Sequence, residues 1–153
     1  MMRYLDDFTV GETFEAPAGA LSEAEIIEFA EIFDPQSFHT DPEAAKTSPF
    51  GGLIASGHQT IGWGFGQIVR LGIFAGDAVI CGADMKDVRW LAPVRPGMTL
   101  VARAEIVDIR PSRSRPGQGY LDIRFSVDGP DGTVARFSTN TLMRTRAGGD
   151  AGA

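Results

Sequence analysis

Residues 119–144 read GYLDIRFSVDGPDGTVARFSTNTLMR, and this stretch decides the fold class. Its first ten residues alternate between apolar and polar side chains, and a period of two is typical of a strand with one buried face. The apolar positions are Leu121, Ile123, Phe125 and Val127. The DGPDG motif at residues 128–132 is a strong turn signal, and residues 133–144 follow it as the partner strand. We therefore predict an antiparallel β-hairpin.

Three more strands are predicted around this hairpin. Residues 78–90 and 99–110 form two of them, and a short third strand is predicted within residues 13–20. The strand at 99–110 has one apolar side, made of Leu100, Ala102, Ala104 and Ile106.

Two helices are predicted in the first half of the chain. The capping-box pattern at residues 22–25 opens the first, and Pro35 helps to end it. Its apolar positions are Ile26, Ile27, Phe29, Ala30 and Phe33. Residues 35–52 form a structured loop with a short turn at 43–46. A second helix is predicted from about residue 57 to residue 74.

The second helix holds Gly57, Gly62, Gly64, Gly66 and Gly72. Each glycine costs a helix about 1 kcal/mol relative to alanine. Close packing against a sheet wrapped around the helix explains such a composition, because side chains would not fit there. The elements add up to an α+β fold, an antiparallel sheet around one long central helix.

The chain has 153 residues, of which 43% are hydrophobic and 22% are charged, as in an ordinary globular domain. We predict one domain over residues 1–145 and a flexible C-terminal tail over residues 146–153. The net charge of −6 argues against nucleic acid as a general partner.

A cytoplasmic location without membrane contact is expected. The N-terminal residues lack the apolar core of a signal peptide, and no run of 18 apolar residues occurs. The one cysteine, Cys81, cannot form an internal disulfide, which fits a reducing compartment. It lies in an apolar run and is interpreted as a small buried hydrophobic residue rather than a catalytic thiol.

The segment with the clearest chemistry is residues 34–42, DPQSFHTDP. Asp34 and His39 lie five residues apart in a loop stiffened by prolines, where both can point at one water molecule. General acid–base catalysis needs one group that takes a proton and one that gives a proton. On spacing alone, an Asp and a His in a loop are more often part of a turn and a surface hydrogen bond.

Residues 29–42 resemble the hydratase motif of MaoC-like proteins and (R)-specific enoyl-CoA hydratases. In those families an Asp and a His in the order D-x4-H form the catalytic pair, and Asp34 and His39 match both positions. Residues 49–57 resemble the family's entry into the central helix, and residues 88–97 resemble its next strand and turn.

The resemblance spans roughly residues 4 to 145 and implies the hot-dog fold. It also implies a homodimer with active sites near the interface, and an open sheet edge invites such pairing. The substrate implied is an acyl-CoA thioester, so coenzyme A is part of the substrate and no separate cofactor is expected. Three local departures from the family pattern concern Phe33, Gln36-Ser37 and Ser56-Gly57-His58. They leave the D-x4-H pair intact.

The implied reaction adds water to a trans-2-enoyl thioester, or removes it, with a (3R)-hydroxyacyl product. Asp34 would act as base on the water, and His39 would hold the same water and help to deliver a proton to the α carbon. The resemblance places the Gly57 N–H at the thioester oxygen, where a helix N-terminus suits developing negative charge. Gly57 is equally consistent with a tight turn into a packed helix.

Four further residues are candidates for substrate binding. Ser56 and His58 flank Gly57, and His58 is either a polar first-turn residue or part of the pocket. Arg113 and Arg115 lie in a basic loop, residues 110–117, that is either a solvated hairpin or an anchor for coenzyme A phosphates. A metal site is not expected, because the chain has two His and one Cys and no ligand-spaced cluster.

Two other functions stay open at this point. One is a hot-dog thioesterase, which would attack the carbonyl carbon of the thioester, and the D-x4-H motif argues against it. The other is a non-catalytic acyl-thioester binding protein, against which the intact Asp34 and His39 argue. The acyl chain, and the choice between coenzyme A and acyl carrier protein, are not defined by the sequence.

Overall fold

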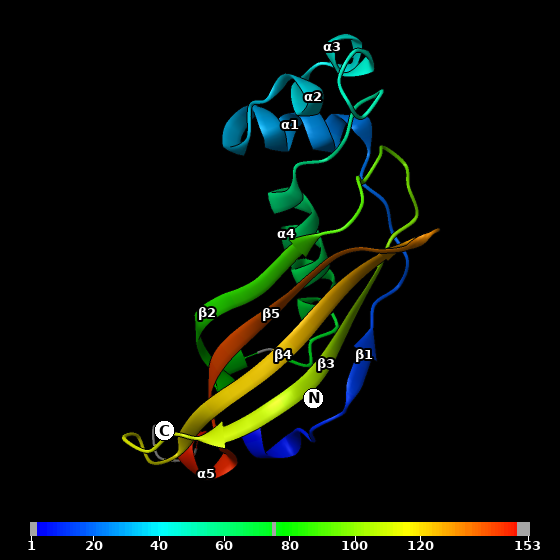
Figure 1. Ribbon diagram of the computed structural model, residues 1–153. Helices are drawn as coiled ribbons and strands as arrows, with labels where there is room; N and C mark the ends of the chain where they lie inside the picture. Colours follow the sequence, from blue (N-terminus) through cyan, green and yellow to red (C-terminus); the bar gives the residue numbers. More distant parts are fainter. Residues whose placement is uncertain (1–2, 75, 150–153) are drawn as a thin grey trace.

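The computed structural model describes residues 3–74 and 76–149. Its five strands form one antiparallel sheet in the order β1-β3-β4-β5-β2 (Figure 1). The strands are β1 (Thr13–Glu15), β2 (Val79–Trp90), β3 (Val101–Pro111), β4 (Gln118–Gly129) and β5 (Gly132–Arg144). All the predicted strands are present, and the β4–β5 hairpin turns at the predicted position, with Gly129 opposite Gly132.

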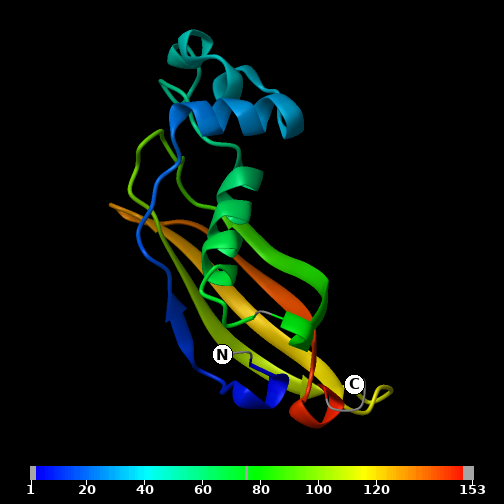
Figure 2. The same cartoon turned by 180° about the vertical axis from the view of Figure 1, so that it is seen from behind.

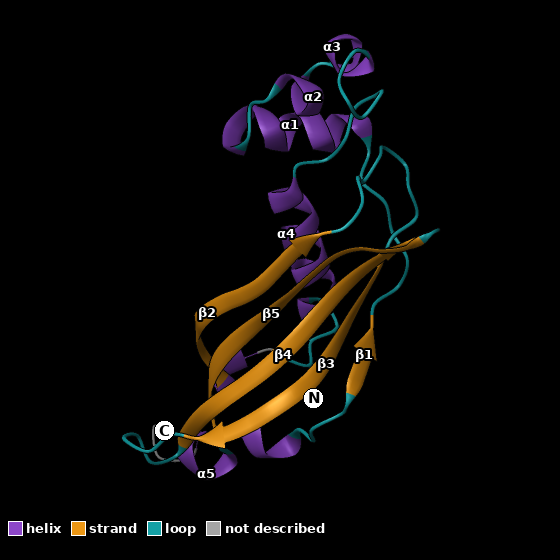
Figure 3. Ribbon diagram, viewed as in Figure 1, coloured by secondary structure: helices purple, strands orange, loops and turns teal. Residues whose placement is uncertain are grey.

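One long helix, α4 (Gly57–Val69), lies along one face of this sheet and contacts β3, β4 and β5 (Figure 2). The short helices lie at the two ends of the molecule (Figure 3). They are η1 (Leu5–Asp7), α1 (Glu23–Phe33), α2 (Ser37–Thr40), α3 (Pro42–Lys46), η2 (Gly76–Ala78) and α5 (Arg146–Gly149). The predicted α+β architecture, a sheet around one central helix, is confirmed.

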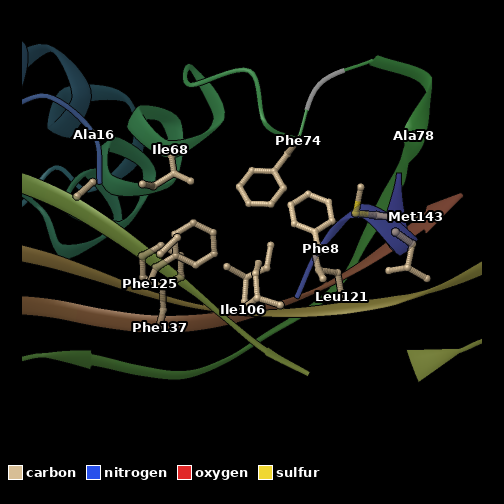
Figure 4. Close-up of a cluster of buried hydrophobic side chains, with 14 of the residues drawn as sticks. Phe8, Ala16, Ile68, Phe74, Ala78, Ile106, Leu121, Phe125, Phe137 and Met143 are labelled. Atoms are coloured by element: carbon tan, nitrogen blue, oxygen red, sulfur yellow. The ribbon is translucent and has the colours of Figure 1, made fainter. Parts of the chain in front are cut away.

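The core lies between α4 and the sheet (Figure 4). Alternation along the strands brings one face of each into this layer, and the apolar positions predicted on β3 and β4 are all buried. Phe125 and Phe137, on neighbouring strands, stack with their ring centroids 4.7 Å apart. Ile68 and Phe74 close the layer from the helix side.

The glycines of α4 are explained only in part by packing against the sheet. A Cβ on Gly64 would collide with the side chain of Val127, so close packing against the sheet explains this glycine. A Cβ on Gly62 would meet nothing within 4 Å, and one on Gly66 would meet only the Arg70 side chain. Gly72 lies beyond the helix with φ +74°, so the prediction of a helix to residue 74 was too long.

Helix α1 begins at the predicted capping box, where Ser22 Oγ accepts from the Glu25 N–H and the Glu25 carboxylate accepts from the Ser22 N–H. Ile26 and Ala30 are fully buried, but Phe33 is 67% exposed. Not every apolar position named on this helix therefore lies in the core, because α1 lies at one end of the molecule and buries only one face.

The segment after α1 is more regular than the predicted loop. It contains α2 and α3, and Asp41 caps α3 by accepting from the N–H groups of Glu43 and Ala44. Each of these helices is only about one turn long. A helix this short has too few residues for hydrophobic periodicity to predict it.

Strand β2 forms one edge of the sheet, and among the described residues it pairs with β5 alone. Most of its residues are exposed, and Cys81 is among them. The prediction that Cys81 is buried was wrong for the single chain, because an apolar run on an edge strand has neighbours on one side only.

Helix α5 lies beside the 3-10 helix η1 near the start of the described residues. Arg146, the first residue of α5 and of the predicted tail, pairs with the Asp7 carboxylate at 2.6 Å, and its N–H donates to Asp6. The described start of the predicted tail is therefore helical and anchored, whereas residues 150–153 lie outside the described residues. Within the described ranges, every helix is too short or too polar to cross a membrane.

Candidate active site

Asp34 ends helix α1 and points its carboxylate at the start of α4. Its own N–H still donates to the carbonyl of Ala30, so the residue is fixed by the last helical turn. Oδ2 accepts a 2.7 Å hydrogen bond from the Ser56 hydroxyl, and Oδ1 accepts one of 2.8 Å from the Gln36 side-chain amide. With an 18% exposed side chain, the carboxylate is held from two sides yet remains open to a small molecule.

His39 lies on the one-turn helix α2 rather than in an irregular loop. Its Nδ1 donates to the carbonyl oxygen of Ile54 at 2.7 Å, because a carbonyl can only accept. This bond leaves Nε2 free, and Nε2 lies 3.4 Å from Asp34 Oδ2. The two groups predicted to act together are therefore neighbours.

The hydrogen bonds at Asp34 keep its carboxyl ionised. The amide of Gln36 lowers the pKa of Asp34 most, followed by the hydroxyl of Ser56. Burial opposes them, and the positive charge that His39 and His58 can carry lowers the pKa further. The carboxylate form needed by a base is therefore favoured at neutral pH.

Ser56 connects the carboxylate to the central helix. It is the N-cap of α4, fully buried, and its hydroxyl oxygen accepts a 3.3 Å hydrogen bond from the His58 N–H while its hydroxyl proton is donated to Asp34. Ser56 was predicted to bind the substrate, and in the structure its hydroxyl donates to Asp34.

Gly57 is the first residue of α4, and the indole of Trp90 lies directly over it. A Cβ on Gly57 would collide with the Nε1, Cε2 and Cδ1 atoms of that indole. His58 is exposed beside them, with its ring 5.9 Å from the Trp90 ring in an edge-to-face arrangement. Space at Gly57 is therefore limited by Trp90 as well as by the helix itself.

One cavity of about 440 Å³ lies beside these residues. The members of its wall that bring polar groups are Asp34, His39, Gly57, His58 and Thr60. The rest of its wall is mostly apolar and includes Phe38, Phe50, Ile54, Trp90, Leu91, Pro93, Val94 and Val134. An apolar cavity with a few convergent polar groups is the usual form of a small-molecule site.

The basic loop does not reach this cavity within one chain. Residues 112–117 join β3 to β4 at the end of the sheet farthest from α1–α3, as both views of the ribbon show (Figures 1 and 2). Arg113 and Arg115 are exposed there. In the described residues, no group of three or more His, Cys, Asp or Glu side chains could hold a metal ion.

Two residues of the site were not predicted from the sequence, namely Gln36 and Trp90. Gln36 was noted only as a departure from the family pattern, although its position two residues after Asp34 allows the side-chain contact. Trp90 was assigned only to a strand, and no local pattern shows that the end of β2 meets the start of α4.

Comparison with known proteins identifies the family. A family model described as "MaoC like domain" matches residues 7–122. The chain is also similar to the uncharacterized protein YdeM of Bacillus subtilis (strain 168), with 38% identity over 113 residues, which cover 74% of this chain and 79% of YdeM.

Solved structures are similar to this chain as well. The MaoC-like dehydratase from Rhodospirillum rubrum superposes with a TM-score of 0.85 at 34% identity, covering 94% of this chain and 98% of that one. The R-hydratase PhaJ1 from Pseudomonas aeruginosa has a TM-score of 0.74 at 19% identity, covering 93% and 85%. A Mycobacterium tuberculosis protein with a double hotdog fold has a TM-score of 0.76 at 21% identity, covering 94% and 44%. The last two bear on the fold alone. The chain therefore has the hot-dog fold and belongs to the MaoC-like dehydratase family.

Proposed function

We propose that the protein hydrates trans-2-enoyl thioesters of coenzyme A, or dehydrates the corresponding (3R)-hydroxyacyl thioesters. The observation that carries this proposal is the pair of Asp34 and His39, 3.4 Å apart on the wall of an apolar cavity. A base and a proton donor on one side of a bound alkene are what water addition needs. The similarity to a MaoC-like dehydratase at 34% identity supports the same reaction class.

In the hydration direction, Asp34 accepts one proton from a bound water while the water oxygen bonds to the β carbon. The electrons of the double bond move toward the thioester carbonyl. Protonated His39 then delivers the proton from Nε2 to the α carbon. The proton on Asp34 is then passed to His39, which restores both groups for the next turnover.

The negative charge that develops on the thioester oxygen needs a hydrogen-bond donor. The Gly57 N–H is the proposed one, because it belongs to the first turn of α4, where N–H groups have no partner within the helix. Ser56 would hold Asp34 rather than the substrate. His58, which also lines the cavity, is proposed as a substrate contact.

A homodimer formed through the open edge of β2 is part of the proposal. Exposed apolar side chains lie on or just after this strand, namely Met85, Trp90 and Leu91. An exposed edge with apolar side chains favours pairing with a second strand.

Antiparallel pairing at this edge would turn the second copy end for end. The loop with Arg113 and Arg115 in one protomer would then lie at the same end as the cavity of its partner. Arginine binds phosphate through two parallel hydrogen bonds, so these residues are proposed to hold the coenzyme A phosphates of the partner's substrate.

The experiment that tests the proposal is a panel of trans-2-enoyl-CoA thioesters of different chain length, followed by loss of the enoyl absorbance. We expect turnover of at least one member with the thioester intact. Release of free coenzyme A without hydroxyacyl-CoA would instead indicate a thioesterase. Binding without turnover across the panel would indicate an acyl-thioester binding protein.

A further inference from the structure

Gln36 contacts both Asp34 and His39. Its side chain contacts Asp34, and its main chain contacts His39. Its side-chain Nε2 donates to Asp34 Oδ1 at 2.8 Å. Its main-chain carbonyl accepts from the N–H groups of His39 at 2.9 Å and Thr40 at 3.2 Å, which makes Gln36 the N-cap of α2. Its own N–H donates to the carbonyl of Asp34 at 2.8 Å.

The side chain and the main chain of Gln36 therefore act separately. The helix that carries His39 is capped by the main-chain carbonyl, and the Gln36 side chain makes no capping hydrogen bond. Any residue except glycine or proline at position 36 should preserve this cap. The side-chain amide, by contrast, has one recorded partner among the described residues, the Asp34 carboxylate.

Gln36 and Ser56 hold opposite oxygens of the same carboxylate. Each oxygen of an ionised carboxylate has two lone pairs. Oδ2 accepts from Ser56 and faces His39. Among the described residues, Oδ1 accepts from Gln36 alone, which leaves one of its lone pairs open. Donors on opposite oxygens restrain rotation of the carboxylate, and they therefore favour one direction for that open lone pair.

We propose that Gln36 is a positioning residue, whose amide fixes the plane of the Asp34 carboxylate so that the open lone pair of Oδ1 receives the reacting water. This inference rests on the proposed function, because it assigns Asp34 the role of base. It assigns a role in the site to a residue outside the D-x4-H pair. That residue, Gln36, lies at a position where this chain departs from the family pattern.

Electrostatics support the same role. The hydrogen bond from Gln36 is the largest cause of the lowered pKa of Asp34, ahead of that from Ser56. The ionisable groups that act on this carboxylate are His39 from α2 and His58 from α4, and both lower its pKa. Removal of the Gln36 amide should therefore raise the pKa of Asp34, and the acid limb of kcat should move to higher pH.

Three variants test the proposal. Gln36→Leu keeps the size and removes the amide, and Gln36→Glu replaces it with a second carboxylate. Ser37→Ala is the matched control, because Ser37 is the next exposed residue and no side-chain hydrogen bond is recorded for it in the described chain. Since the main-chain cap is preserved, all three should unfold at similar temperatures.

We expect Gln36→Leu to lower kcat by about tenfold, the equivalent of one charge-assisted hydrogen bond, with KM changed by less than about twofold. Its acid limb should move to higher pH, and that of Gln36→Glu should move further because the two carboxylates repel. Ser37→Ala should match the wild type. Equal kcat and coinciding pH profiles in all four proteins would overturn the proposal.

A titration of the Asp34 side-chain carboxyl by NMR, without substrate, separates this proposal from the proposed function. A higher pKa of Asp34 in Gln36→Leu and in Gln36→Glu supports the positioning role even if no tested thioester reacts. An unchanged Asp34 titration in both variants overturns it, whether or not the wild type is active. If Gln36→Leu fails to fold, Gln36→Glu decides the same question alone.

Discussion

The indole of Trp90, at the end of β2, occupies the space that a side chain at Gly57, the first residue of α4, would need. The two residues are far apart in the sequence and meet at the wall of the cavity. A Cβ at position 57 must therefore displace either the indole or the helix start that presents the Gly57 N–H.

Gly57→Ala should destabilise the protein by about 1–3 kcal/mol, the usual cost of overpacking, and should lower kcat as well. The matched control is Gly62→Ala on the same helix, where a Cβ would meet nothing within 4 Å. That variant should be neutral or more stable by up to about 1 kcal/mol, the difference in helix propensity. Urea unfolding of the two variants measures this, and equal stability would contradict the proposed collision with Trp90.

Asp34→Asn and His39→Gln should each lower kcat by about 10²–10⁴-fold, the scale of positioned acid–base groups. Asp34→Asn keeps the shape of the side chain but cannot accept the proton. His58→Gln provides the comparison, because it removes the chain's other imidazole and should change KM more than kcat. Steady-state kinetics with an accepted thioester measure all three, and wild-type turnover by Asp34→Asn or His39→Gln would remove the catalytic assignment.

Replacement of Arg113 and Arg115 with alanine should raise KM with little loss of kcat, because binding shared by the ground and transition states is lost. A double replacement of Arg124 and Arg136, two exposed arginines within β4 and β5, changes the net charge equally and should leave KM unaltered. The KM values for a coenzyme A thioester decide this. An unchanged KM in the first variant would mean that the basic loop is only a solvated hairpin.

The protein should be at least a dimer at micromolar concentration, as measured by light scattering. Met85→Lys, which places a charge on the exposed edge strand β2, should shift the protein toward a monomer, since charged residues protect sheet edges from pairing. A wild-type monomer at this concentration would refute the dimer, and with it the proposed contribution of Arg113 and Arg115 from the partner.

The sheet could be predicted because alternation along the strands directly reflects burial. Leu121, Ile123, Phe125 and Val127 all lie in the core as their spacing requires. The same local logic found the capping box of α1 and the exit that presents Asp34. It failed for Cys81, because the exposure of this residue depends on which neighbours are missing at a sheet edge.

Only part of the candidate site could be predicted from the sequence. The spacing of Asp34 and His39, together with the family resemblance, was sufficient to predict the pair. Two other contacts of the site were not predictable. Ser56, which holds Asp34, lies 22 residues downstream of it, and Trp90, which lies over Gly57, comes from the far end of β2. Such contacts are set by how α1, α4 and β2 meet in three dimensions.

The product formed from a trans-2-enoyl-CoA tests the account most directly. Asp34 and His39 converge on one side of the cavity, so the hydroxyl group and the proton should reach the same face of the double bond, with the thioester oxygen held at Gly57. Chiral analysis of the hydroxyacyl-CoA reports the configuration of the product. A thiol assay on the same sample reports whether the thioester stays intact. We predict a (3R) product, formed by syn addition, and no free coenzyme A. A (3S) product, or free coenzyme A without hydroxyacyl-CoA, would contradict this prediction.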